Sequence, residues 1–344
     1  MPKVTVIIPN YNHGRFLTKR LKSVLHQTFQ DFEVIYLDDA STDNSNEVLA
    51  KFADDGRIRA VFNDVNGGVP FKQWNKGVRL AQGEYVWIAE ADDYADERLL
   101  ERLVRKLDEN PNVGLAYCES LRVDERDNVI PWVEVWRENS RRWDQDFINA
   151  GADECGRSLV CHNTIPNASG VLFRRSVYER AGYADETLKV SGDWLMWIKM
   201  LLISDIAYVA EPLNYFRLHS KSVGGNADSG GVYHEEAYRV IRYLLEHAAV
   251  SKEMAEQARQ TIVGEWVDTT LSKRWKIPWD RQRVIYRAAR QVDPKLKRRL
   301  GKSIIYQLLR KNALLAPFVP LIQYRKRVLG QSRSTAASIH GSTR

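Results

Sequence analysis

The chain has 344 residues, 44% of them hydrophobic, and a formal net charge of +7, which suits one large domain or two ordinary ones with a substantial core. Its three cysteines, Cys118, Cys155 and Cys161, are too few and too scattered for a disulfide framework or a zinc site, so we expect a reducing, cytoplasmic environment. We find no N-terminal signal peptide and no uncharged apolar run of about 18 residues, and we therefore expect no membrane-spanning helix.

Strands and helices alternate along the first third of the chain. Buried strands are expected at 4–8, 32–37, 58–62 and 85–89. Each of these runs is followed by a stretch in which apolar residues recur at helical spacing. This alternation is typical of a parallel sheet covered by helices on both faces. We therefore predict an α/β fold with a doubly wound, mostly parallel sheet.

The next part of the chain is less regular, and it ends in a helical, basic region. Further strands are expected at 113–117, 169–173, 206–209 and 214–218, and a buried helix at 194–202. From about residue 235 the pattern is helical. The final polar residues, 331–344, are expected to be disordered.

An acidic loop, Glu90-Ala91-Asp92-Asp93, follows the fourth predicted strand. Ligands of open parallel sheets bind at the carboxyl ends of the strands. Carboxylates crowded there repel one another unless a cation is bound, and a divalent ion such as Mn²⁺ or Mg²⁺ could bridge them to a substrate phosphate. The alternative is that these acids only cap a following helix.

Polar residues also follow the first two strands, at the same predicted edge of the sheet. Tyr11 offers a ring that can stack on a flat base, and Asp39 can accept hydrogen bonds from a base or a ribose hydroxyl. The glycine-rich dinucleotide and Walker patterns are absent from the sequence, so a metal on Asp92 and Asp93 would have to neutralise a diphosphate. The alternatives are that Tyr11 is a packed loop aromatic and that Asp38 and Asp39 only cap a helix.

Taken together, these motifs resemble the start of a family 2 glycosyltransferase. The matching segments are Val4-Thr5-Val6-Ile7-Ile8-Pro9-Asn10-Tyr11-Asn12, residues 27–34, and Asp38-Asp39-Ala40-Ser41-Thr42-Asp43. The resemblance implies a GT-A fold over 1–230, with a nucleotide-sugar-binding half at about 1–117 and an acceptor-binding half at about 118–230. A helical basic region, 231–330, and the tail, 331–344, would follow.

The resemblance also implies roles for individual residues. Donor contacts would come from Pro9, Tyr11, Asp38, Asp39, Lys72 and Arg217. Metal contacts would come from Asp92, Asp93, Glu90 and His219. Asp193 would be the catalytic base that deprotonates the acceptor hydroxyl, the alternative being a helix N-cap. His219 could instead be a surface residue.

Three positions depart from the family pattern. Glu90 stands where the acidic motif usually begins with Asp. Gly192 replaces a Glu before the base. In the segment 66–77 a Gln-Trp-Asn run replaces the usual Arg, so that Lys72 would stand in for it as a point charge, while Trp74 is expected to be a buried helix residue.

Positive charge is concentrated near the C-terminus. Residues 273–330 contain 17 Lys or Arg, against Asp280 and Asp293 as acids. An apolar run, 313–322, lies within this region. We expect basic amphipathic helices on an anionic membrane surface, at the inner membrane face. The alternatives are helices that pack on the rest of the molecule or that form a homo-oligomer. Nucleic-acid binding is not expected, because no basic-domain motif accompanies the charge.

The predicted function is therefore that of an inverting, metal-dependent glycosyltransferase. It would transfer a sugar from a nucleotide-diphosphate sugar to a hydroxyl acceptor, such as a lipid-linked glycan of a surface polysaccharide. A sugar nucleotidyltransferase is a nearby alternative, although the Gly-rich, Arg-containing loop of those enzymes is not at residues 9–14. A non-catalytic scaffold that binds a glycan or a nucleotide sugar is the more distant one.

Overall fold

The computed structural model describes residues 1–131, 141–219, 230–272 and 277–311. Within these residues nine strands form one sheet, in the order β3-β2-β1-β4-β8-β6-β9-β5, with β7 paired to β9. The strands are β1 (Val4–Asn10), β2 (Phe32–Asp38), β3 (Ile58–Phe62), β4 (Tyr85–Ile88), β5 (Tyr94–Ala95), β6 (Val113–Val123), β7 (Phe147–Asn149), β8 (Val171–Arg174) and β9 (Asp205–Arg217).

The first half of the sheet is parallel, as predicted. β1 lies between β2 and β4, and β2 pairs with β3. The helices between these strands are α1 (Gly14–Leu25), α2 (Ser45–Ala50) and α3 (Pro70–Leu80), and α4 (Leu99–Asp108) follows. Asn10 of β1 is in register with Asp38 of β2, and Ile7 of β1 is in register with Ile88 of β4. The loops after β1, β2 and β4 therefore emerge side by side at one edge of the sheet.

Each face of the sheet has its own core. Successive residues of a strand point to opposite faces. Val6 and Ile8 therefore pack with α1, α2 and α4, whereas Ile7 packs with α3. This two-sided burial explains why the strands are almost continuously apolar in sequence.

The second half of the sheet is mixed. β8 is antiparallel to both β4 and β6, β6 and β9 are parallel, and β5 closes the sheet antiparallel to β9. One prediction was wrong in detail, and one alternative is excluded. The strands expected at 206–209 and 214–218 form one strand, β9, whose pairing with β6 is irregular near Pro212. The acidic loop is followed by β5, and α4 begins only at Leu99, so its acids are not caps of that helix.

Short helices connect these strands and carry the later motifs. They are η1 (Arg142–Asp144), α5 (Gly151–Glu154), η2 (Cys155–Leu159), η3 (Ala168–Gly170), α6 (Arg175–Arg180) and α7 (Gly192–Leu201). Trp194 and Trp197 of α7 are almost completely buried, as the apolar density of that segment predicted.

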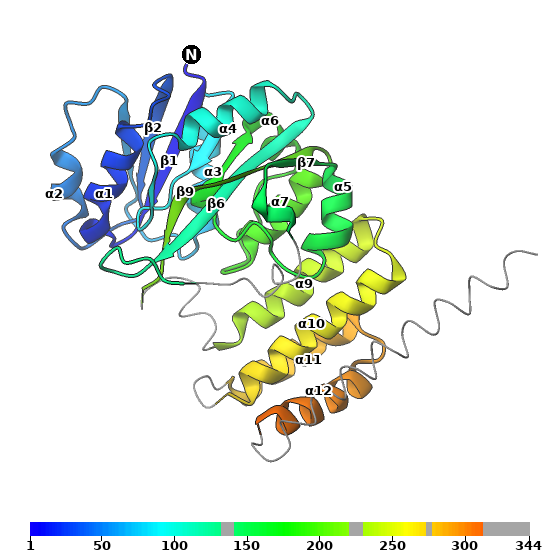
Figure 1. Ribbon diagram of the computed structural model, residues 1–344. Coiled ribbons are helices and arrows are strands. Elements are labelled where there is room, and N and C mark those ends of the chain that lie inside the picture. The colour runs from blue at the N-terminus through cyan, green and yellow to red at the C-terminus, as the bar shows by residue number, and fades with distance from the viewer. Residues whose placement is uncertain (132–140, 220–229, 273–276, 312–344) are drawn as a thin grey trace, which may run out of the picture.

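The C-terminal helices stack beyond one end of the sheet (Figure 1). They are α9 (Val232–His247), α10 (Lys252–Thr270), α11 (Trp279–Val292) and α12 (Leu296–Lys311). A single apolar core contains Trp197 of α7 together with Ile241, Trp266 and Ile285 from the first three of these helices. The core is thus continuous across residue 230, and the described helices pack on the rest of the molecule.

The outer helices nevertheless keep an apolar surface. Trp279 is 84% exposed, Ile305 is 61% exposed and Leu308 is 56% exposed. No helix in the described ranges is both long and apolar enough to cross a bilayer. The apolar run 313–322 and the tail 331–344 of the sequence predictions lie outside the described residues.

Candidate active site

Asp92 faces two histidines at the carboxyl edge of the sheet. His219 Nε2 lies 2.9 Å from Asp92 Oδ2, and one ligand atom each of His13, Asp92 and His219 lie within 4.8 Å of one another. These residues follow β1, β4 and β9, so the sheet brings three distant segments together. Two imidazoles and a carboxylate suit a divalent transition ion such as Mn²⁺. The set therefore fits the predicted metal, with His13 as a member that the sequence reasoning missed.

The charge state of this group suits a cation. Burial acts to raise the pKa of Asp92, but the hydrogen bond to His219 and the nearby His13 outweigh it and hold the pKa below its usual range. Burial lowers the pKa of His13. A metal ligand must be a deprotonated carboxylate or a neutral imidazole, and both shifts favour that state.

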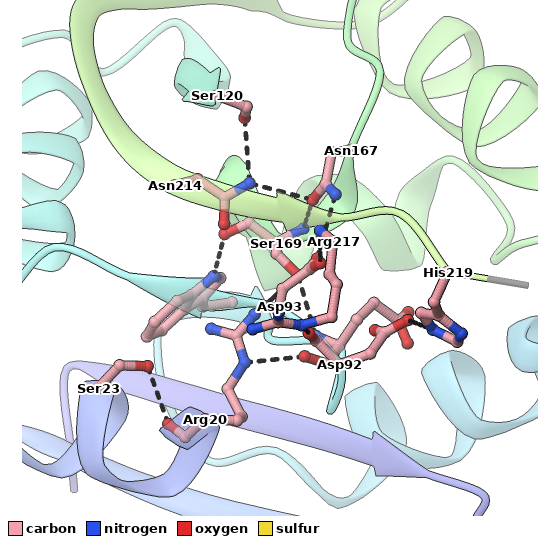
Figure 2. Close-up of polar contacts among 12 residues, drawn as sticks. Arg20, Ser23, Asp92, Asp93, Ser120, Asn167, Ser169, Asn214, Arg217 and His219 are labelled. Carbon is pink, nitrogen blue, oxygen red and sulfur yellow. Dashed lines mark hydrogen bonds and ion pairs between the residues drawn. The ribbon is translucent and has the colours of Figure 1, made fainter. Parts of the chain in front are cut away.

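Asp93 faces the protein interior instead. Its carboxylate accepts hydrogen bonds from Asn167 Nδ2 at 3.1 Å and from the backbone N–H of Arg217 at 2.8 Å (Figure 2). Burial raises its pKa to about 6, with the charge of Asp92 adding to the effect. Asp93 thus ties the acidic loop to β9 and is separate from the contacts that Asp92 makes with the histidines.

Two buried arginines supply positive charge beneath the acidic loop. Arg20 of α1 donates from Nε to the Glu90 carbonyl at 2.8 Å, and its Nη2 lies 3.9 Å from Asp93 Oδ2. Arg217 donates from Nε to the Asp92 carbonyl at 2.7 Å and from Nη2 to Asp127 Oδ1 at 2.6 Å. From the sequence we expected a bound cation to relieve the repulsion among the crowded carboxylates. These two guanidinium groups already relieve part of it. The guanidinium of Arg217, predicted to contact the donor, is committed to these internal bonds.

The three departures from the family pattern meet at one place. Glu90 accepts a hydrogen bond from Trp74 Nε1 at 2.8 Å, and burial raises its pKa to about 8. Trp74 packs edge-on against Phe71, with ring centroids 5.0 Å apart. A Cβ on Gly192 would lie 2.4 Å from the Phe71 ring. The Phe71 side chain thus occupies the space that a longer residue at position 192 would need. Trp74 is buried, as predicted.

Asp39 organises the loop that precedes α3. Its carboxylate accepts hydrogen bonds from the Gly67 N–H at 2.9 Å and from Gln73 Nε2 at 2.7 Å. Lys72 Nζ donates to the Gly67 carbonyl at 2.9 Å, so Lys72 and Asp39 converge on one loop. Next to Asp39, Asp38 binds Asn10 and Tyr36 rather than capping α2, whose N-cap is Asn44.

The first strand ends beside this loop. Pro9 is buried in β1, in register with Leu37. Tyr11, just beyond the strand, is 46% exposed, so its ring is accessible and the packed-aromatic alternative is wrong. His219, by contrast, is 8% exposed, which excludes the surface alternative.

Asp193 lies in the first turn of α7. Its Oδ1 accepts a hydrogen bond from the Trp194 N–H at 2.6 Å, and its Oδ2 accepts one from Asn163 Nδ2 at 3.2 Å. Burial outweighs both bonds and raises the pKa to about 7. The N-cap position is taken by Ser191, so Asp193 is not the cap. A carboxylate whose pKa lies near neutrality is suited to proton abstraction.

A family comparison identifies the first half of the chain. The model for "Glycosyl transferase family 2" matches residues 5–181, which contain β1, β2, β4 and the acidic loop. The chain belongs to glycosyl transferase family 2.

Two individual relatives share less than a third of their aligned residues with this chain. An uncharacterized glycosyltransferase of Nostoc sp. is 29% identical over 227 residues, which are 63% of this chain and 65% of the relative. The poly(ribitol-phosphate) beta-N-acetylglucosaminyltransferase TarS of Staphylococcus aureus is 25% identical over 277 residues, which are 79% of this chain and 45% of TarS. The chain therefore spans less than two thirds of the length of either relative.

Solved structures of two glycosyltransferases have the same fold. The structure of S. aureus TarS 1–349 in complex with UDP-GlcNAc has a TM-score of 0.64 at 19% identity and covers 88% of this chain and 90% of that one. The mannosyltransferase PcManGT from Pyrobaculum calidifontis, in complex with GDP-Man and Mn²⁺, has a TM-score of 0.54 at 16% identity and covers 90% and 88%. The fold is GT-A-like, as predicted, with a helical C-terminal region.

Some site residues of this family 2 chain were missed in the sequence. His13 had a usable signal, since it lies in the turn directly after the first strand. Arg20 and Asn163 had none, because a basic residue on a helix and an amide in an irregular segment are ordinary surface features until the tertiary contacts are known.

Proposed function

We propose that this protein is an inverting, metal-dependent glycosyltransferase that uses a nucleotide-diphosphate sugar. The observation that carries the proposal is the group of His13, Asp92 and His219 at the carboxyl edge of the sheet, together with Asp193, a carboxyl group whose pKa burial raises to about 7. A chain of contacts runs from the entry to α7 to the acidic loop. Gly192, next to Asp193, contacts Phe71, which packs on Trp74, the partner of Glu90.

In this proposal Asp193 takes the proton of the acceptor hydroxyl as that oxygen attacks the anomeric carbon. The bond from the anomeric carbon to the diphosphate oxygen breaks at the same time, so the configuration inverts and a nucleoside diphosphate leaves. The pKa of Asp193, about 7, supports the role, because a base works best near the operating pH. Asn163 holds the carboxylate in one orientation.

Donor binding would use the edge formed by β1 and β2. Tyr11 would stack on the base, and Asp39 would accept hydrogen bonds from the base or ribose. Pro9 and Asp38 would form the floor of the nucleotide site, and Lys72 would approach the phosphates of the donor. The donors in the TarS and PcManGT structures, UDP-GlcNAc and GDP-Man, support a nucleotide sugar of this class.

His13, Asp92 and His219 would hold the metal, with Mn²⁺ favoured over Mg²⁺ by the two imidazoles. A bound divalent ion would supply charge stabilisation for the leaving diphosphate. Mn²⁺ in the PcManGT structure is consistent with this. Asp93 and Glu90 would support the loop from within.

The acceptor would be a glycan or a lipid-linked glycan of a surface polysaccharide, met at the inner membrane face. Exposed Trp279, Ile305 and Leu308, on helices rich in Arg and Lys, support binding to an anionic membrane. Flotation with phosphatidylglycerol vesicles should carry the protein upward, and Trp279→Ala combined with Leu308→Ser should reduce it. Equal flotation with neutral phosphatidylcholine vesicles would argue against a contribution of the Arg and Lys residues to membrane binding.

The experiment that tests the function is a thermal-shift screen against UDP-, GDP- and dTDP-sugars, with and without Mn²⁺. A ligand that binds the native state raises the melting temperature by mass action. We expect one nucleotide class to stabilise the protein, with Mn²⁺ required, and Asp92→Ala to abolish the effect. Release of pyrophosphate from a sugar 1-phosphate and a nucleoside triphosphate would instead indicate a nucleotidyltransferase. Donor binding without any release of nucleoside diphosphate would favour the scaffold alternative.

A further inference from the structure

A buried glutamate of the C-terminal helices holds the segment that precedes α7. Glu236 of α9 is 4% exposed. Its Oε1 accepts a hydrogen bond from the Lys189 N–H at 2.7 Å. Its Oε2 accepts two more, from the Val190 N–H at 2.9 Å and the Ser191 N–H at 2.8 Å. One carboxylate thus binds three consecutive backbone N–H groups.

These contacts fix the entry to α7. Ser191 is the N-cap of that helix, yet its side chain makes no capping hydrogen bond. The first N–H groups of a helix and of the turn before it need acceptors when they are buried. Glu236 supplies an acceptor from another helix, and its negative charge lies near the positive end of the α7 dipole. The orientation of the first turn therefore depends on α9.

We infer that Glu236 is a positioning residue for Asp193, an inference that rests on the proposed role of Asp193 as the base. Asp193 lies two residues beyond Ser191, so a shift of the 189–191 segment moves the carboxylate directly. Misplacement of a reacting group by about 1 Å can cost roughly 100-fold in rate. It follows that the helices after residue 231 take part in assembling the active site.

Glu236 also acts on Asp193 through its charge. Burial is the main cause of the raised pKa of Asp193, and the charge of Glu236 adds to it, while hydrogen bonds from the Trp194 N–H and from the neutral Asn163 lower it. Two variants change Glu236 in different ways. Glu236→Asp keeps the charge but shortens the reach. Glu236→Gln removes the charge and, because its NH₂ group cannot accept, also gives up either the bond to Lys189 or the two bonds to Val190 and Ser191.

A matched control lies one residue away. Glu235 is also on α9 and forms an ion pair with Arg281 at 2.6 Å, away from the 189–191 segment. Glu235→Gln therefore removes a glutamate and a contact between helices without touching the entry to α7.

The first measurement needs no donor. Urea unfolding of the full chain and of its Asp193→Asn variant between pH 5 and 9 gives a stability difference that changes with pH and then levels off. The pH at which its slope has fallen to half, here called the midpoint, reports the pKa of Asp193 in the folded protein. We expect Glu236→Gln to lower that midpoint by roughly 0.5–1 pH unit, the effect of removing one nearby like charge. Glu235→Gln should leave it unchanged. If Glu236→Gln fails to fold, the inference is tested with Glu236→Asp, by the rate at which nucleoside diphosphate is released.

The second measurement is release of nucleoside diphosphate from UDP-N-acetylglucosamine and GDP-mannose with Mn²⁺. We expect Glu236→Asp to lower kcat roughly 10- to 100-fold, because the shorter side chain no longer holds the segment that positions the base. The KM for the donor should be unchanged, because the proposed donor contacts are on other elements. If both Glu236 variants match Glu235→Gln in rate and in midpoint, the inference is wrong. If Asp193→Asn itself turns over normally, it is the base assignment that fails.

Discussion

Replacement of Asp193 by Asn should inactivate the enzyme and stabilise it at the same time. Burial raises the pKa of Asp193 from 3.8 to about 7. Because the folded state binds the proton more tightly, stability falls as the pH rises from 3.8 to 7 and the full penalty applies above pH 7. That penalty is at most about 4 kcal/mol. Asn at this position carries no charge, so it escapes the penalty.

The gain should be somewhat smaller than this limit. Asn163 donates to Asp193, while its own carbonyl oxygen accepts a hydrogen bond from the Ile165 N–H at 3.2 Å. An Asn at position 193 brings a second amide NH₂ group, so Asn163 must turn its amide and give up that bond, at a cost of about 1 kcal/mol. We therefore expect a net gain of roughly 3 kcal/mol above pH 7.

Urea unfolding at pH 8.5 measures the gain, which should shrink to less than half at pH 5. Release of nucleoside diphosphate should fall roughly 100- to 10,000-fold, the usual contribution of a general base. Affinity for the donor should stay the same. A variant that is no more stable than the parent at pH 8.5 would refute the desolvation argument. Turnover within a few-fold of the parent would refute the role of Asp193 as the base.

Three further predictions concern other parts of the site. Asp92→Ala should weaken Mn²⁺ binding at least about 10-fold in isothermal titration calorimetry, whereas Asp54→Ala, which changes an exposed acid between α2 and β3, should leave it unchanged. Gly192→Ala should destabilise the protein by about 1–3 kcal/mol, because its methyl group meets the Phe71 ring; Phe71→Leu should offset part of that loss in thermal unfolding, and strict additivity would contradict the contact. Tyr11→Ala should weaken nucleotide binding by about 1–3 kcal/mol in a fluorescence titration if the ring stacks on the base, with Tyr11→Phe close to the parent.

The sequence predicted the elements whose signals are local. Buried parallel strands are apolar over their whole length, so β1, β2 and β4 and the shared edge after them could be read from hydrophobic runs and polar ends. β9 was split in the prediction because Pro212 interrupts the pattern. In the structure that residue lies at a pairing irregularity with β6, where a strand can accept a proline without ending.

The candidate site was predictable in position but not in its internal contacts. Asp92 and Asp93 are neighbours of the same residue type, and nothing in the sequence tells which of them faces the histidines and which faces Asn167. Arg20 belongs to a different segment, 70 positions before Glu90 in the chain, and its burial depends on that loop being in place. Such pairings are tertiary and leave no periodic trace.

The hydrogen bonds between Glu236 and the residues before α7 also have a consequence for folding during synthesis, because Glu236 is translated after Asp193. Translation adds about 5–20 residues per second, so residue 236 is made roughly 2–9 seconds after Asp193. Until α9 exists, the three N–H groups of Lys189, Val190 and Ser191 lack the carboxylate that binds them in the finished protein. The edge of the sheet proposed to bind the donor can thus form in the nascent chain before Asp193, the proposed base, is held in place.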